Sequence, residues 1–442
     1  MLLDFRTKNY KSFVEETSFN MVAAPKQKGL DYSLCTEKIK GKTIKGLSSS
    51  VIYGPNAAGK TNIIGAMDVM RAIILRGNIR NSEEKSSPNP ASAALEFIPN
   101  NNKEQAEPVE LAVRFAEDGM EIGYSLTADL GTFLDDEYKR KIVKEELIVN
   151  GEEIFLRTND LTIGNLKQIK SFIADSVGNN IDGLVEISTN GLNPEELFLT
   201  NGFKLIFSQS LVKLITDWFT NKFMVIYRAD SMHLIKRFSD PQKKAVYVEK
   251  TTDKAAKLFG INSNALGYVV SDDEAEAKLC ALFKDSKNHK TAAMAAELFE
   301  SYGTIRFINM FPLVLRAILT GGTLVVDEFD ASIHPMALMS IINIFHNDDI
   351  NIHHSQLIFN THNPIFLNSN LFRRDEIKFV ERDDDSHYSR LYSLSDFGTT
   401  GEKGVRKHAD YMKSYFVSEY GAIKDIDFTP IFEEIIASEG KV

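Results

Sequence analysis

The stretch that decides the fold reads Gly54-Pro55-Asn56-Ala57-Ala58-Gly59-Lys60-Thr61. It matches the pattern GxxxxGK[ST] at every fixed position. Loops of this kind turn backbone N–H groups toward phosphate oxygens, while the lysine adds a point charge and the hydroxyl residue contacts Mg²⁺. We therefore predict that Gly54 to Thr61, with Asn62 directly behind them, bind the phosphates and Mg²⁺ of ATP.

The residues on either side of this loop predict a strand, a loop and a helix in that order. Ser48 to Tyr53 form a short strand-like run, and Ile63, Met67, Met70 and Ile74 recur at helical spacing. The phosphates would then lie at a helix N-terminus, where the helix dipole favours anions. A glycine-rich turn that matches the pattern by chance would not require this order, so we favour the phosphate-binding interpretation.

A second motif places two carboxylates at the end of a strand. A helical pattern over Thr304 to Leu319 stops at Gly321, and the apolar run Thr323 to Val326 then leads into Asp327 and Glu328. Alone, such a pair fits equally well the acidic first turn of a helix. Together with the phosphate loop it predicts that Asp327 holds Mg²⁺ and that Glu328 orients and activates the attacking water.

Two further positions are candidate nucleotide contacts. The segment ESYGT opens the helix just described, with Ser301 as a predicted N-cap and Gly303 in the first turn, although a capped helix start explains the same residues. His362 follows the apolar strand Gln356 to Phe359, at the edge where parallel sheets bind ligands. We predict that His362 senses the γ-phosphate, because it comes after the other motifs in this order.

These motifs together resemble a family of bacterial ABC-like ATPases of the overcoming-lysogenization-defect and abortive-infection type, which includes RloA-like, AbiLi-like and PARIS AriA-like proteins. The resemblance rests on NYKSF at 9–13, GPNAAGKT, ESYGT, VVDEFDASIHP at 325–335, and FNTHNP followed by FRRDEI at 372–377. It implies a homodimer or higher homo-oligomer that hydrolyses ATP, in which Ser301 and Gly303 meet the phosphate held by the other subunit. It also implies control of a toxic effector protein in anti-phage defence.

The expected fold is α/β, an ABC-type (SMC/RecF-like) P-loop ATPase head with an antiparallel β subdomain and a helical insertion. We predict four segments: an N-terminal ATPase lobe at 1–90, the β subdomain at 91–160, a mostly helical insertion at 161–298 and a C-terminal ATPase lobe at 299–442. No clear Q-loop glutamine follows the first lobe, since Gln105 lies in a polar stretch. About 80 residues follow His362, too few for a TOPRIM nuclease domain, so we expect the effector to be a separate polypeptide.

Composition limits the partners and the compartment. The net charge of −10 disfavours a whole-surface attraction to nucleic acid, and Arg373 with Arg374 is one of two basic clusters. Only two cysteines are present and the N-terminus lacks the order of a secretory signal, so we expect a cytoplasmic protein without a membrane span. Two alternatives stay open: a slow, nucleotide-gated scaffold that cages a partner, and an SMC/RecF-like DNA-repair ATPase.

Overall fold

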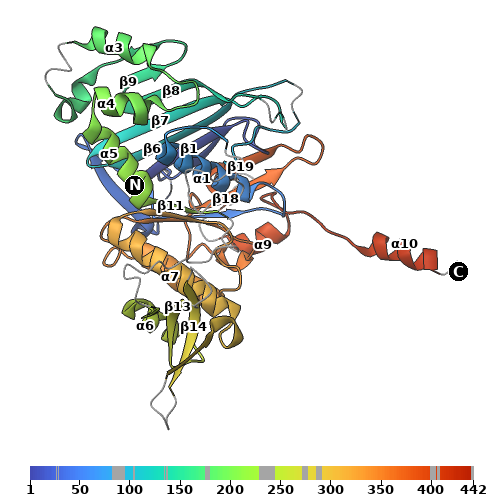
Figure 1. Cartoon of the computed structure of the whole chain (residues 1–442). Coiled ribbons are helices and arrows are strands. Elements are labelled where there is room, and N and C mark those ends of the chain that lie inside the picture. Colours follow the sequence, from blue (N-terminus) through green and yellow to red (C-terminus); the bar gives the residue numbers. More distant parts are fainter. Residues whose placement is uncertain are drawn as a thin grey trace.

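The computed structural model describes residues 1–25, 27, 29–81, 95–102, 105–133, 135, 138–174, 180–227, 244–270, 277–284, 291–398, 405 and 409–439. The predicted limit between the first two segments, at residues 90 and 91, lies outside the described residues. Figure 1 shows a parallel sheet in the middle of the molecule and a larger antiparallel sheet on one side of it.

The parallel sheet carries the nucleotide motifs. Its strand order is β11 (Phe223–Ile226), β16 (Thr323–Val326), β17 (Gln356–Asn360), β5 (Ser49–Tyr53), β18 (Ile377–Arg382) and β19 (Ser389–Ser393). The first five strands are parallel to one another, and β19 is antiparallel to β18. The carboxyl ends of the five parallel strands therefore meet at one edge, where ligands bind in such sheets.

Helices cover both faces of this sheet, which explains why its strands are continuous apolar runs. Ile52 and Ile358 point to the core that holds the buried face of α1 (Lys60–Arg76). Their neighbours Val51 and Phe359 point to the opposite core, which holds α7 (Tyr302–Thr320) and α8 (Pro335–Phe345). Alternation of side chains along a strand produces this division.

The seven-stranded antiparallel sheet packs on the other side of α1. Its order is β10 (Leu161–Ile163), β9 (Glu152–Arg157), β8 (Lys141–Val149), β7 (Met120–Asp129), β6 (Val109–Glu117), β1 (Leu2–Lys8) and β2 (Thr17–Asn20). Strands β8 and β9 are joined by a tight hairpin turn at Asn150 and Gly151, whose φ values of 55° and 81° are those that a type I′ turn requires. Strands β1 and β2 thus share a sheet with strands from the predicted β subdomain.

The segment predicted as a mostly helical insertion, 161–298, is helical only in its first part. That part contains η2 (Leu166–Phe172), α3 (Ile181–Asn190), η3 (Leu199–Phe203), α4 (Lys204–Ile206), α5 (Gln209–Asp217) and η4 (Trp218–Lys222). The second part forms a four-stranded antiparallel sheet of β12 (Ala245–Tyr247), β13 (Ala265–Val270), β14 (Ala277–Lys284) and β15 (Thr291–Ala295), with α6 (Lys250–Phe259) and η6 (Ala296–Leu298) beside it.

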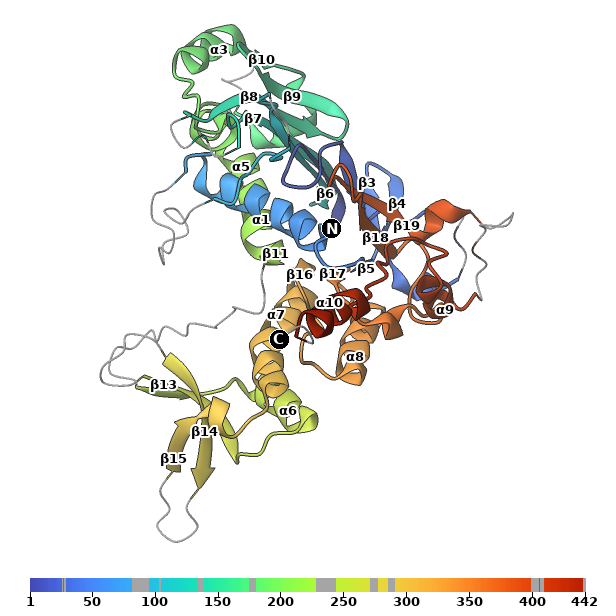
Figure 2. The same cartoon turned by 90° about the vertical axis from the view of Figure 1, so that its right-hand side faces the viewer.

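The prediction of helix is wrong in this second part. Its strands are short, and buried and exposed residues alternate only partly along them. Along β14 the buried positions are Ala277, Leu279, Ala281 and Leu282, so a two-residue period is broken by one adjacent pair. Such short apolar runs do not distinguish a strand from a helix. Figure 2 shows the small sheet beyond α7, on the opposite side of the parallel sheet from the seven-stranded sheet.

The remaining elements are short or lie near the C-terminus. They are η1 (Asp31–Ser33), the hairpin β3 (Leu34–Ile39) and β4 (Lys42–Leu47), η7 (Pro364–Phe366), η8 (Leu394–Phe397), α9 (Tyr411–Phe416) and α10 (Thr429–Glu439). Within the described part of the chain, α7 alone has the length and composition to cross a membrane. Here α7 is a core helix, with Phe307, Met310 and Val314 buried in the core beneath the parallel sheet.

Candidate nucleotide-binding site

The loop after β5 needs its glycines. Gly54 has φ of 155°, and a Cβ on it would lie 2.2 Å from the carbonyl oxygen of Val380. Gly59 has φ of 111° and is the N-cap of α1, which begins at Lys60. Side chains at these positions would be strained or would clash, so the backbone itself can approach a phosphate closely.

The Lys60 ammonium lies inside the loop. Its Nζ donates to the carbonyl oxygens of Gly54 at 2.7 Å and Pro55 at 2.9 Å, and the side chain is almost fully buried. Burial lowers the pKa of Lys60 to about 8, although Asp327 and Glu328 oppose this shift. Among the described residues, the hydrogen bonds of this buried cation go to neutral carbonyl oxygens, which fits a site that takes a polyanion.

The two motifs meet at Thr61 and Asp327. The Thr61 hydroxyl donates to Oδ1 of Asp327 at 3.1 Å, and the same oxygen accepts from Nδ2 of Asn360 at 2.5 Å. Asp327 is buried at the end of β16, next to the end of β17. A hydroxyl and a carboxylate are hard oxygen donors of the kind that Mg²⁺ takes in small number beside phosphate oxygens, so these residues fit a Mg–nucleotide complex.

Asn360 is a site residue that sequence reasoning missed. Its Nδ2 contacts Asp327, and its Oδ1 accepts a hydrogen bond from the backbone N–H of Glu328. It is 1% exposed and ends β17. The signal available in the sequence was a polar residue that closes a buried strand at the ligand-binding edge, two residues before His362.

Glu328 is held by its backbone, while its side chain is exposed. Its φ is 50°, a left-handed conformation that is uncommon outside glycine. The Arg306 guanidinium, from α7, donates to the Glu328 carbonyl oxygen, and Arg306 is itself 5% exposed. Arg306 and Asn360 therefore fix this turn from both sides, and neither was predicted from the sequence.

Ser301 and Gly303 lie at the start of α7. The Ser301 hydroxyl caps the helix by accepting from the backbone N–H of Thr304 at 3.1 Å, as expected for an N-cap. A Cβ on Gly303 would lie 2.1 Å from the carbonyl oxygen of Ser332. Among the described residues, the hydrogen bonds of Ser301 stay within the first turn of α7 and do not reach its own phosphate loop.

His362 follows β17 and is close enough to Lys60 to be affected by its charge. Loss of solvation lowers the pKa of His362, and the Lys60 cation lowers this pKa further. The imidazole is therefore neutral at pH 7 and has one N–H to donate. The adjacent Thr361 hydroxyl donates to Asp330 at 2.6 Å, which ties the strand end to the segment after Glu328.

The other predicted loop residues have structural contacts. The Asn62 side-chain amide donates to the Ser12 hydroxyl at 2.8 Å, and Ser389 donates to the Ala58 carbonyl oxygen at 2.6 Å. Asn56 and Ala57 are exposed at the tip of the loop. Ser12 and Ser389 thus support the loop from behind, and Asn62 uses its side chain for this support.

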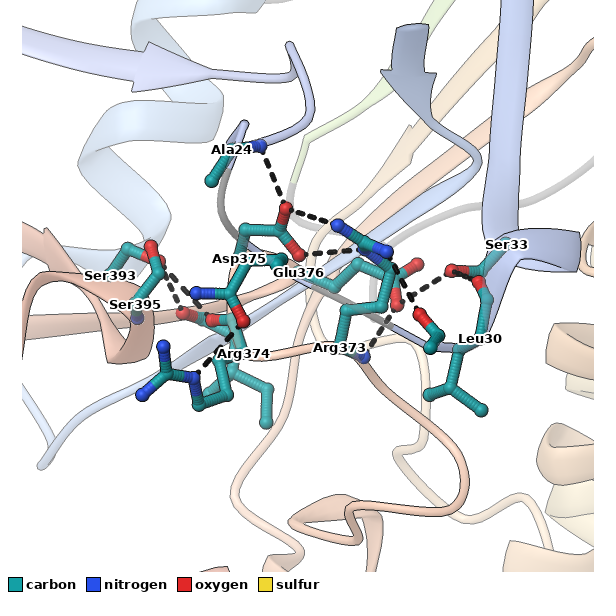
Figure 3. A network of polar contacts seen from close by, with 12 residues as sticks. Ala24, Leu30, Ser33, Arg373, Arg374, Asp375, Glu376, Ser393 and Ser395 are labelled. Atoms are coloured by element: carbon teal, nitrogen blue, oxygen red, sulfur yellow. Dashed lines mark hydrogen bonds and ion pairs between the residues drawn. The ribbon is translucent and has the colours of Figure 1, made fainter. Parts of the chain in front are cut away.

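The basic pair Arg373 and Arg374 is not a surface cluster. Figure 3 shows Arg373 facing Asp375, and its Nε and Nη2 donate to the two carboxylate oxygens at 2.9 Å each. Arg374 donates to the carbonyl oxygens of Gly398 and Val405. Both side chains are at most 6% exposed, so they serve the fold and do not form a nucleic-acid surface.

A buried carboxylate in the same network sits below the phosphate loop, at the other end of β5. Glu376 accepts from the Ser49 hydroxyl at 2.8 Å and the Ser33 hydroxyl at 3.2 Å, and His346 Nε2 lies 3.2 Å from it. His346 is 3% exposed and is therefore part of this buried network.

Comparison with known families gives the identity of the fold. The family described as "AAA domain, putative AbiEii toxin, Type IV TA system" matches residues 49–368. The chain belongs to this AAA family. The match spans Lys60, Asp327 and His362, and together with the parallel sheet described above it makes this AAA protein a P-loop ATPase with the predicted α/β fold.

Three solved structures that are similar to this AAA protein are heads of SMC proteins. The SMC head domain from Thermotoga maritima has a TM-score of 0.33 at 13% identity, covering 89% of this chain and 98% of that chain. The SmcHead bound to the C-winged helix domain of ScpA gives 0.38 at 10%, covering 89% and 97%. The Pyrococcus furiosus Smc head domain bound to the C-terminal domain of ScpA gives 0.37 at 11%, covering 89% and 96%. No curated protein matches the chain.

Proposed function

We propose that this AAA-family chain binds ATP with Mg²⁺ and hydrolyses it. The supporting observation is the contact between Thr61 and Asp327, which joins two motifs that are 266 residues apart in the sequence. A hydroxyl and a carboxylate beside a buried lysine, at the carboxyl edge of a parallel sheet, are the side chains that phosphoryl transfer requires.

Each residue of the proposed site has one task. Lys60 binds the β- and γ-phosphates, and Thr61 and Asp327 hold Mg²⁺. The bound metal neutralises charge on the phosphates. Glu328 orients and activates the water, which its exposed side chain can reach, and neutral His362 donates its N–H toward the γ-phosphate. Backbone N–H groups of Gly54 and of residues 56–62 surround the phosphates.

The complete site requires a second copy of the chain. Ser301 and Gly303 form a helix N-terminus, which favours an anion, yet the Ser301 side chain bonds only within its own first turn among the described residues. We infer that this helix start meets the nucleotide held by another subunit, in a homodimer or a higher homo-oligomer with two sites per pair. The bounds of the four predicted segments remain our proposed division of the chain, with the segment at 161–298 helical in its first part and rich in strands in its second.

The ATPase would control a separate effector protein in cytoplasmic anti-phage defence, as an abortive-infection system. This proposal is supported by the name of the AAA family, which refers to a toxin and to a type IV toxin–antitoxin system. A DNA-repair role is less favoured, because Arg373 and Arg374 are buried and the net charge is −10. The alternative of a slow, nucleotide-gated scaffold that cages a partner would use the same nucleotide-binding site.

Two substitutions test the proposed site. Lys60→Ala should lose ATP binding, because the only buried cation of the loop is removed. Glu328→Gln should bind ATP with unchanged affinity but release phosphate at least ~100-fold more slowly. Glu186→Gln, an exposed change on α3, serves as the matched control. Binding is measured with a fluorescent ATP analogue and turnover by phosphate release; normal turnover by Glu328→Gln would remove it from its role.

A further inference from the structure

The NYKSF turn at residues 9–13 lies directly behind the phosphate loop and holds Ser12 in one position. Two backbone hydrogen bonds of 2.9 Å join Tyr10 and Phe13 in both directions, and both side chains are fully buried. Lys11, between them, has a left-handed φ of 48°, which is uncommon for a residue with a side chain. The turn is therefore a fixed support, and Ser12 within it is 8% exposed.

A chain of hydrogen bonds leaves the phosphate loop, passes through Ser12 and returns to the loop. The Asn62 side-chain amide donates to Ser12 Oγ at 2.8 Å. Ser12 Oγ lies 2.7 Å from Ser389 Oγ, which donates to the Ala58 carbonyl oxygen at 2.6 Å. A hydroxyl has one proton, so Ser389 uses its proton for Ala58 and Ser12 donates to Ser389. The Ser389 N–H also donates to the Ser12 carbonyl oxygen at 2.8 Å, which joins the two serines twice.

The last bond of this chain orients the peptide between Ala58 and Gly59. In a trans peptide the carbonyl oxygen and the N–H point in opposite directions. Because the Ala58 carbonyl oxygen faces Ser389, the Gly59 N–H faces away from the serines and into the loop. Among the described residues, the backbone hydrogen bonds around the loop leave this N–H unused. It is therefore available to an oxygen of a bound phosphate.

The two serines also pack closely against Gly59. A Cβ on this residue would lie 2.6 Å from Ser389 Oγ and 2.9 Å from Ser12 Oγ. Ser389 is 4% exposed, so water does not replace the partners of these hydroxyls. The loop backbone is thus held against a buried pair of side chains that come from β19 and from the turn after β1.

We propose that Ser12 and Ser389 are positioning residues that aim the Gly59 N–H at the phosphates before ATP binds. This inference rests on the proposed ATP-binding function of the loop. Without the two hydroxyls the peptide is free to rotate in the nucleotide-free protein, so ATP binding must also order it. Once ATP is bound, the phosphate itself holds the N–H. The serines should therefore affect the affinity for ATP more than the turnover of the bound complex.

Ser389→Ala separates these two quantities. We expect the dissociation constant for ATP to rise at least ~10-fold, while kcat at saturating ATP changes less than ~3-fold. A fluorescent ATP analogue measures affinity, and phosphate release measures kcat. Ser393→Ala is the matched control on the same strand, since Ser393 is 7% exposed and its hydroxyl donates to the Arg374 and Ile377 carbonyl oxygens. Its ATP affinity should equal that of the wild type, even where both variants melt at a lower temperature.

Ser12→Ala tests whether the two serines act through one chain. Alone, this change should raise the dissociation constant for ATP ~5-fold. In a Ser389→Ala background it should raise it less than ~2-fold, because the link from Ser12 to the Ala58 carbonyl is already broken. Effects that multiply in the double variant would overturn the proposal. If Ser389→Ala fails to fold, Ser12→Ala is compared with Ser393→Ala in its place, and equal affinities would overturn the proposal.

The same measurements distinguish this inference from the proposed function. If Lys60→Ala loses ATP binding and Ser389→Ala binds ATP as the wild type does, the positioning role fails and the proposed function stands. An equal loss of affinity in Ser389→Ala and Ser393→Ala would also overturn the positioning role, because it would reflect stability alone. A wild-type chain that binds no ATP would overturn both.

Discussion

The Thr61 hydroxyl donates a hydrogen bond to the Asp327 carboxylate at 3.1 Å, across 266 residues of sequence. Between the two residues lie most of the seven-stranded sheet, the helices at 166–222 and the small four-stranded sheet. The pairing of β5 with β17, and of β17 with β16, brings their ends together. The site therefore forms only when these three strands have paired.

Asn360→Ala should slow ATP hydrolysis more than it weakens ATP binding. Asn360 joins the Asp327 carboxylate to the Glu328 backbone, so its loss leaves buried polar groups unpaired and frees the turn at Glu328. We expect kcat to fall about 10- to 100-fold, with a smaller change in KM. Steady-state phosphate release measures both constants. Asn368→Ala, at an exposed position nearby, is the control, and an equal effect of the two changes would contradict the assignment.

ATP affinity should fall as pH rises through about 8. Burial lowers the pKa of Lys60 to about 8 in the nucleotide-free protein, and a bound triphosphate favours the ammonium form. ATP binding above this pH must therefore take up a proton, whereas at pH 7 the amine is already charged. Calorimetry in two buffers with different ionisation enthalpies would measure the uptake at pH 8.5. Lys60→Arg, which stays charged, should show no uptake above pH 8.

Two inactive variants should restore activity when mixed, if the sites form between subunits. Lys60→Ala keeps the α7 start and Ser301→Arg keeps the phosphate loop, so a mixed pair contains one intact site and one site with both changes. We expect each variant alone to be inactive and an equal mixture to regain up to about a quarter of the wild-type rate. This value assumes free exchange and independent sites. Failure of the mixture, with exchange verified by subunit tags, would argue for sites within single chains.

Gly303→Ala should damage the site without unfolding the protein. The added Cβ would lie 2.1 Å from the Ser332 carbonyl oxygen, so the start of α7 and the segment after Glu328 must move apart. Gly191→Ala is the matched control, because its Cβ would meet backbone oxygens at an ordinary 3.6 Å. We expect at least a ~10-fold loss of hydrolysis for Gly303→Ala alone. A thermal melt should shift by only a few degrees in either variant.

The sequence predicted those parts of the site that depend on local patterns. Lys60 and Thr61 belong to a motif with fixed spacing, and Asp327 follows a strand that is recognisable by its apolar run. Asn360 and Arg306 have no such pattern, because their role arises only when β17 lies beside β16 and α7 beneath both. Arg373 and Arg374 show the same limit, since two adjacent arginines look like a basic surface until Asp375 and a loop carbonyl are placed against them.

The small four-stranded sheet was missed for a related reason. Its strands are stabilised by pairing with one another, and β15 is exposed along its whole length. No strong periodicity was therefore available in the sequence. By contrast, the turn at Asn150 and Gly151 is recognisable in the sequence. Asn followed by Gly is typical of a type I′ hairpin turn, because both residues of that turn need a positive φ.

Helix α7 carries Ser301 at its first turn and, one turn further on, Arg306, which holds the Glu328 carbonyl of the same chain. If Ser301 meets the nucleotide of a neighbouring subunit, a rigid-body movement of α7 would also shift the turn at Glu328, the proposed water-activating residue, in its own subunit. The two ATP molecules of a pair would then be hydrolysed cooperatively, and rate would depend on ATP concentration along a sigmoidal curve.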